Sequence, residues 1–72
     1  MEYLNNARAY IIRAEACKDQ PILWDYNTSW AEAYWINHLK VTKARQYNIK
    51  VAAFRALINA RNTTEALKYL SK

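Results

Sequence analysis

Apolar residues recur at helical spacing from residue 2 to residue 18. They fall three or four positions apart, which places them on one stripe of a helix. Pro21 disfavours continuation, so we predict that this helix ends near residues 19–20. Cys17 lies on the stripe, and we expect it to be a small core residue. The stripe consists of Tyr3, Leu4, Ala7, Tyr10, Ile11, Ala14 and Cys17.

Residues 19–28 follow as a predicted loop that is unusually apolar. Trp24 within it is expected either to cover the helices as a lid or to serve as an exposed anchor. Ser29 and Glu32 then have the spacing of a capping box, directly before an apolar stretch. This spacing predicts a second helix from Ser29 to about Gln46.

The expected second helix has two apolar faces at about 100° per residue. A chain of 72 residues has few helices to cover both of them. We therefore predict that one face is internal and that the other meets a partner or a second copy of the chain. One face holds Trp30, Tyr34 and Val41 with Ala33 beside them; the other holds Ala31, Trp35 and Leu39 with Ile36 at its edge.

Two more helices are predicted after this one. Asn48 is a plausible N-cap for a helix over 49–61. Asn62 and Glu65 again have capping spacing, which predicts a short last helix over 63–70 with Leu67 and Leu70 directed inward. The pattern therefore predicts an all-α fold, a small bundle of three main helices plus a short C-terminal helix, in one domain over 1–72. The core stripe expected for 49–61 is Ile49, Ala53, Ala56, Leu57 and Ala60, widened by Phe54 and Ile58.

The composition agrees with a helical protein and limits its turns. The chain has no glycine and one proline, so we expect few residues with positive φ, and Asn where one is needed. A single cysteine excludes an internal disulfide and suits a reducing compartment. The sequence contains no apolar run of about 20 residues, and we expect no secretory signal. We expect a cytoplasmic protein with no membrane segment.

Charge is divided unevenly along the chain. Residues 1–36 carry three basic and five acidic side chains, a net charge of −2, whereas residues 37–72 carry eight basic and one acidic, a net charge of +7. A basic half suits nucleic acid or an acidic protein surface, and it is equally compatible with a solvated face. Direct DNA binding through residues 40–55 is therefore one of two functional hypotheses. The basic surface expected for it is Lys40, Lys43, Arg45, Lys50 and Arg55.

Catalytic and metal chemistry find no pattern to support them. Cys17 and His38 are the only residues of their kinds, and they fall on different predicted helices. One Cys and one His do not make the ligand set of a zinc site, and a phosphate loop requires glycine. We predict no enzyme, no cofactor and no metal.

The second hypothesis is a protein-binding module, because half of the ten aromatic residues fall within 21–35. Aromatic residues and Arg are enriched at binding hot spots, and a basic half can steer an acidic partner. The opposing interpretation is that these aromatic residues form the core. The residues expected to bind a partner protein are Trp24, Trp30, Tyr34, Trp35 and Leu39.

Two segments support the protein-binding hypothesis. WAEAYW at 30–35, followed by NIKVAAFRALI at 48–58, resembles the ANR family, the AraC negative regulators of enteric bacteria. That family has a Trp after an alanine pair and then Asn-x-x-Trp-Ala-x-x-Arg-x-x-Phe-Cys; Asn48, Ala52 and Arg55 keep this spacing. The chain departs from it at Val51, Ile58 and Asn59, in place of Trp, Phe and Cys.

The resemblance implies a short, helical, cytoplasmic regulator of transcription. Such a protein binds an AraC-type activator and blocks its dimerisation or its DNA binding. The shared positions also have a purely structural interpretation, with Asn48 as a helix cap, Ala52 as a packing residue and Arg55 as a solvated side chain.

Overall fold

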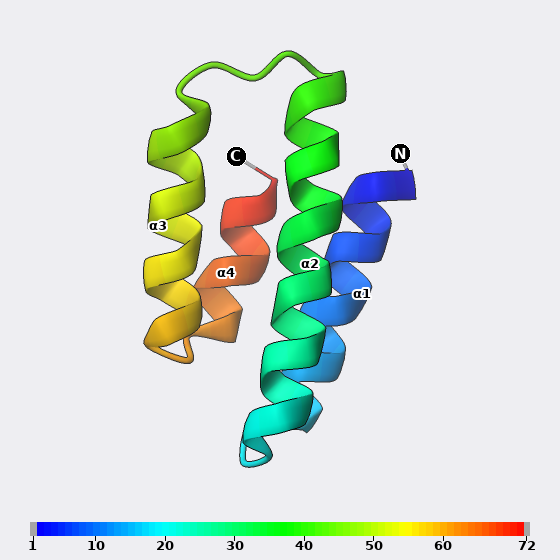
Figure 1. Ribbon diagram of the computed structural model, residues 1–72, viewed down its shortest axis with the longest axis vertical. Coiled ribbons are helices and arrows are strands. Elements are labelled where there is room, and N and C mark those ends of the chain that lie inside the picture. The colour runs from blue at the N-terminus through cyan, green and yellow to red at the C-terminus, as the bar shows by residue number, and fades with distance from the viewer. Residues whose placement is uncertain (1, 72) are drawn as a thin grey trace.

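The computed structural model describes residues 2–71, and its fold is the all-α bundle that the sequence predicts. Consecutive helices run in opposite directions, so that the chain passes up and down the long axis of a molecule measuring 34 × 22 × 17 Å (Figure 1). Helix α2 is the longest and packs along α1, while α4 contacts both α1 and α3. The helices are α1 (Glu2–Ala16), α2 (Pro21–Val41), α3 (Tyr47–Asn59) and α4 (Thr63–Leu70).

The core is built around the indole of Trp35, whose side chain is 1% exposed. Its ring lies 4.9 Å from the ring of Phe54 in α3 and 5.8 Å from that of Tyr69 in α4, measured between centroids. Ile11 supplies the largest buried side chain of α1. Every helix therefore contributes to one cluster, which is completed by Ala7, Ala31, Leu39, Val51, Ala66 and Leu70.

Helix α2 begins eight residues earlier than the capping-box spacing predicted, so the loop expected over 19–28 is wrong. Pro21 occupies the first turn, where its missing N–H is not needed. Asn27 and Thr28, which resemble loop residues, are buried because their side chains donate to the carbonyls of Leu23 and Trp24 one turn earlier. Trp24 is therefore a core residue, 3% exposed, on the same buried stripe as Trp35.

The start and the buried face of α3 also differ from the prediction. The N-cap is Gln46, in left-handed conformation, and Asn48 lies inside the helix. Val51 and Phe54 form the buried face, whereas Ile49 is 65% exposed. Ala56 and Ala60, also expected in the core stripe, are exposed too. The error arose because apolar residues, mainly alanine and isoleucine, lie on several sides of this helix. Periodicity alone therefore did not identify the side that is buried.

Positive φ values occur at Lys43, Gln46 and Arg61, and at no Asn within 2–71, contrary to our expectation. Two of these residues complete Schellman motifs, the hydrogen-bonded endings that usually place glycine at this position. After α2, Ala44 N–H bonds the carbonyl of Leu39 at 2.9 Å. After α3, Asn62 N–H bonds that of Leu57 at 2.9 Å. These bonds offset the roughly 1–2 kcal/mol that a side chain costs in this conformation.

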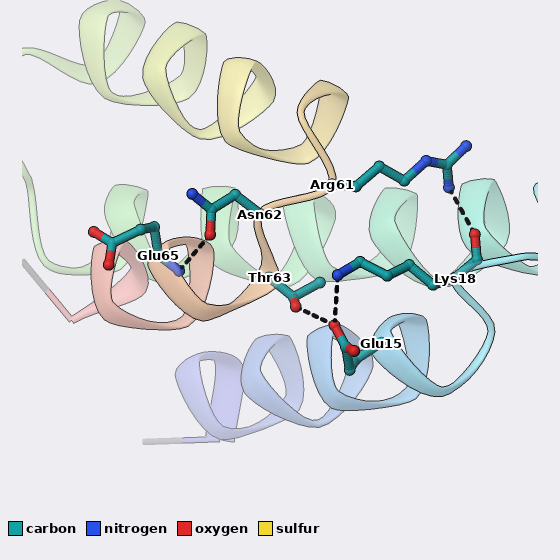
Figure 2. Close-up of polar contacts among 6 residues, drawn as sticks. All are labelled: Glu15, Lys18, Arg61, Asn62, Thr63 and Glu65. Atoms are coloured by element: carbon teal, nitrogen blue, oxygen red, sulfur yellow. Dashed lines mark hydrogen bonds and ion pairs between the residues drawn. The ribbon is translucent and has the colours of Figure 1, made fainter.

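Helix α4 has the predicted cap and is tied to the end of α1. The side chain of Asn62 accepts from the backbone N–H of Glu65 at 3.2 Å, and Thr63 is buried. Figure 2 shows the Thr63 hydroxyl donating to the carboxylate of Glu15, which also pairs with Lys18 at 3.2 Å. These contacts lower the pKa of Glu15, chiefly through the Thr63 hydrogen bond.

Arg61 closes the same end of the molecule. Its guanidinium donates to the carbonyl of Lys18 at 3.2 Å, and it lies 4.5 Å above the ring of Trp24 (Figure 2 shows the hydrogen bond). The α3–α4 turn is thereby fastened to the α1–α2 turn. The remaining space between them is a hollow of about 410 Å³ lined partly by Ile12 and Leu67.

We expect Trp35→Ala to remove a large part of the free energy of unfolding. Removing a buried Trp costs about 3–5 kcal/mol, and a chain of this length has a total stability of only about 4–10 kcal/mol. Urea denaturation followed by circular dichroism measures this loss. Ile49→Ala, which removes an exposed side chain, is the control and should change the free energy of unfolding by less than about 0.5 kcal/mol. An unchanged midpoint for Trp35→Ala would contradict its place in the core.

Protonation of Glu15 should destabilise the fold, because a carboxyl with a lowered folded-state pKa contributes stability above its unfolded pKa and loses it as pH falls through the folded value. The urea midpoint of the wild type should therefore fall between about pH 5 and pH 3 by more than that of Glu15→Gln. Thr63→Val keeps the packing and removes the donor, so it should also flatten the pH profile. Parallel profiles for all three proteins would refute the role of this contact.

Candidate protein-binding surface

The outer side of α2 carries a row of exposed apolar side chains. Ile22 is 84% exposed, Tyr26 55% and Trp30 44%, at intervals of four residues that keep them on one side of the helix. The opposite side packs in the core through Ala31, Trp35 and Leu39. Helix α2 therefore has two apolar faces, as its sequence indicated, and one of them is solvent-exposed.

Helix α1 places the half-buried Tyr10 beside this row. Its ring stacks on that of Trp30 at 6.3 Å and on that of Tyr34 at 5.7 Å. Trp30 in turn lies 5.9 Å from Tyr34 and 6.5 Å from Tyr26, between ring centroids. The four rings form one continuous network across two helices. We call Tyr10, Tyr26, Trp30 and Tyr34 the aromatic surface.

A shallow apolar hollow lies within the aromatic surface. It measures about 250 Å³ and is lined by Tyr26, Ser29, Trp30 and Ala33. At one border the guanidinium of Arg13 lies 4.9 Å above the ring of Tyr10. A partner would meet rings held in place by one another, so few side-chain rotamers would be lost on binding. Exposed, preordered aromatic rings beside an arginine are typical of a protein-binding hot spot.

Of the five residues expected to bind a partner, two lie on the aromatic surface and three are buried in the core. Trp30 and Tyr34 belong to the aromatic surface. Trp24, Trp35 and Leu39 are 1–4% exposed, which corrects their assignment: a partner cannot reach these side chains in the folded protein. Tyr10 and Tyr26 were missed. Tyr10 was placed on the core stripe of α1, and Tyr26 fell in the supposed loop, so the four-residue interval between Tyr26 and Trp30 was not recognised as helical.

Of the five basic residues expected to form one surface, Arg55 is paired within the fold and the other four are not. Arg55 is bound to Glu32 through two hydrogen bonds of 2.9 Å that join α3 to α2. This hydrogen bonding, and then the charge of Glu32, raise the pKa of Arg55. The remaining four lie around the α2–α3 connection: Lys40, Lys43 and Arg45 are exposed, and Lys50 is half-buried.

Two of the positions shared with the ANR family have structural roles here, whereas Asn48 is not the helix cap and Ala52 is not a packing residue. Trp35 is a core residue, and Arg55 links two helices. Asn48 lies in the first turn of α3, and Ala52 is exposed. Comparisons of the chain with protein-family models, with curated proteins and with solved structures found no match.

Two further observations concern residues 2–71 as a whole. None of their helices combines the length and the apolar character needed to cross a membrane. No three of their His, Cys, Asp and Glu side chains are grouped closely enough to hold a metal ion. His38 is half-buried in the last turn of α2, where a basic side chain complements the helix dipole.

Trp30 should account for most of the tryptophan fluorescence that a soluble quencher can reach, because Trp24 and Trp35 are 3% and 1% exposed. Acrylamide titration of the wild type and of Trp30→Phe measures this. The substitution should remove most of the quenchable fraction while the buried emission remains. Equal quenching of the two proteins would contradict the exposure of this ring.

Proposed function

We propose that this protein is a small regulator that acts by protein–protein contact through the aromatic surface. The observation that carries the proposal is the network of four rings on the outside of α1 and α2, with Tyr26 and Trp30 half-exposed. Water is a poor environment for such rings, and burying them against a partner would be favourable by about 25 cal/mol for each Å² of apolar surface.

Tyr10 and Tyr34 are half-buried and pack against the core cluster, whereas Tyr26 and Trp30 lie outside it. The core cluster around Trp35 and Phe54 is filled from the other side of α2. In a 72-residue chain, the exposure of two adjacent aromatic side chains, Tyr26 and Trp30, on one side favours a binding role. The net charge of +5 and the position of Arg13 at the border favour an acidic partner surface.

The resemblance of WAEAYW and NIKVAAFRALI to the ANR family suggests which partner to test first. An AraC-type transcriptional activator would be bound by the aromatic surface and prevented from dimerising or from binding DNA. The resemblance concerns the class of partner, and the aromatic surface, which includes Trp30 and Tyr34 of WAEAYW, supplies the contact.

The test is affinity capture from a nuclease-treated bacterial lysate, with the captured proteins identified by mass spectrometry and the main one purified for titration. Trp30→Ala should weaken binding about thirtyfold or more, as expected for a tryptophan hot spot worth about 2 kcal/mol. Ile49→Ala is the matched control, because it removes an exposed apolar side chain from α3, and it should bind normally. Circular dichroism checks that both variants are folded.

The outcomes separate the parts of the proposal. Capture of an AraC-type activator by the wild type and by Ile49→Ala, but not by Trp30→Ala, supports the whole proposal. If the captured protein is of another class and its binding is also lost in Trp30→Ala, the aromatic surface remains the binding site and the proposed class of partner is wrong. Equal binding by both variants overturns the surface. If analytical ultracentrifugation shows a wild-type dimer that Trp30→Ala dissociates, the surface joins two copies of this chain, and the proposal of a separate partner fails.

A further inference from the structure

Four basic side chains gather where α2 passes into α3, at the top of Figure 1. Lys40 lies in the last turn of α2, Lys43 and Arg45 lie in the connection, and Lys50 lies in the first turn of α3. The chain has no acidic residue between Glu32 and Glu65. We call Lys40, Lys43, Arg45 and Lys50 the basic turn.

The positive charges of the basic turn are not used within the fold. The ion pairs among residues 2–71 employ Lys18, Arg55 and Lys68, and none of the four. The first turn of α3 contains no acidic residue. Helix α1 begins with Glu2 and runs antiparallel to α2, so one carboxylate lies toward this end (Figure 1). Four cations against one carboxylate leave this end strongly positive.

We propose that the basic turn binds the phosphate backbone of a nucleic acid duplex without reading its sequence. A duplex carries about one negative charge for each 1.7 Å of its axis. The two shorter dimensions of the protein are 22 and 17 Å, so an end of the bundle is wide enough to face several phosphates at once. Lysine and arginine side chains on an exposed turn can adapt to these phosphates individually.

The structure argues against base readout by α3. Helix-turn-helix proteins insert the N-terminal part of a recognition helix into the major groove, with polar side chains on base edges. The exposed residues of α3 include Ile49, Ala52 and Ala56, which offer no hydrogen bonds to bases, and Asn48 is the one exposed amide in its first turn. Arg55, the guanidinium best placed in sequence for this role, is bound to Glu32. Apart from the single amide of Asn48, the contacts that remain are those to phosphate, which position a protein but do not select a sequence.

The proposal sets the expected salt dependence. Four phosphate contacts give a slope of about −3.6 in a plot of log affinity against log salt, so that binding weakens roughly a hundredfold between 50 and 200 mM salt. Loss of two contacts should halve that slope, and the same change of salt should then weaken binding only about tenfold. Fluorescence anisotropy of a labelled mixed-sequence duplex measures both.

The variant is Lys43→Gln with Arg45→Gln, and its matched control is Lys18→Gln with Lys68→Gln. Both pairs of substitutions remove two positive charges, but Lys18 and Lys68 lie on other parts of the molecule and are engaged with Glu15 and Glu65. The first variant should show the halved slope, and the control should keep the wild-type slope. Circular dichroism confirms that both fold.

Several results would overturn the proposal. An equal loss of affinity in both variants would mean that net charge alone attracts the duplex. An absence of binding at 20 mM salt would remove nucleic acid as the ligand. Binding to vesicles of anionic phospholipid in preference to the duplex would assign the basic turn to a lipid surface. A strong preference for one duplex sequence would require base contacts, which this geometry does not provide.

Discussion

The contact between Trp35 and Phe54 is the constraint on which the rest of the bundle depends. The two rings lie 4.9 Å apart and join α2 to α3, while Tyr69 brings α4 against the same indole. A small chain buries only about 60% of its unfolded surface, so one large side chain shared by three helices accounts for much of its cohesion. Once Trp35 faces inward, Trp30 must lie on the outer half of α2, because five residues rotate a helix by about 140° beyond one full turn. The exposure of the aromatic surface is therefore a consequence of the core.

The absence of glycine makes the corners of this fold depend on side chains. Lys43 and Arg61 adopt the left-handed conformation that glycine would adopt without strain. Arg61 offsets its strain with a hydrogen bond to the carbonyl of Lys18 and a cation–π contact with Trp24. For Lys43 no such contact is present within 2–71, and its ammonium group remains exposed. One corner is thus stabilised by its own side chain, whereas the other presents its side chain to solvent, where it joins three further cations.

Local patterns predicted those parts of the fold that local interactions determine. The centre of the α1 stripe and the Asn62 cap of α4 are of this kind, since each depends on residues within one or two turns. The ends of that stripe were wrong, because Tyr3 is 42% exposed and Cys17 lies beyond the helix and is half-buried. The start of α2 was missed because Asn27, Thr28 and Ser29 resemble a loop, and only the i−4 hydrogen bonds of the first two make them helical. Glu32, taken as half of a capping box, instead binds Arg55, 23 residues away. Tertiary packing brings these two residues together, and the short sequence patterns that identify helices and caps do not extend over such a separation.

The same reasoning explains why the candidate site was only half predicted. The sequence indicated that α2 has two apolar faces and led us to expect a binding surface among its aromatic residues. Composition alone, however, does not distinguish a core tryptophan from a surface one. What separates them is the tertiary packing: Trp24 and Trp35 are buried, whereas Trp30 stacks on the half-buried Tyr10 of α1 and stays 44% exposed. Helix α2 thus combines three surfaces: a buried face, an outer face of rings and a basic end. Because the rings lie along the helix and the cations lie at its C-terminal end, a protein partner and a phosphate backbone would meet different residues. A regulator arranged in this way could contact its protein partner while that partner is close to nucleic acid.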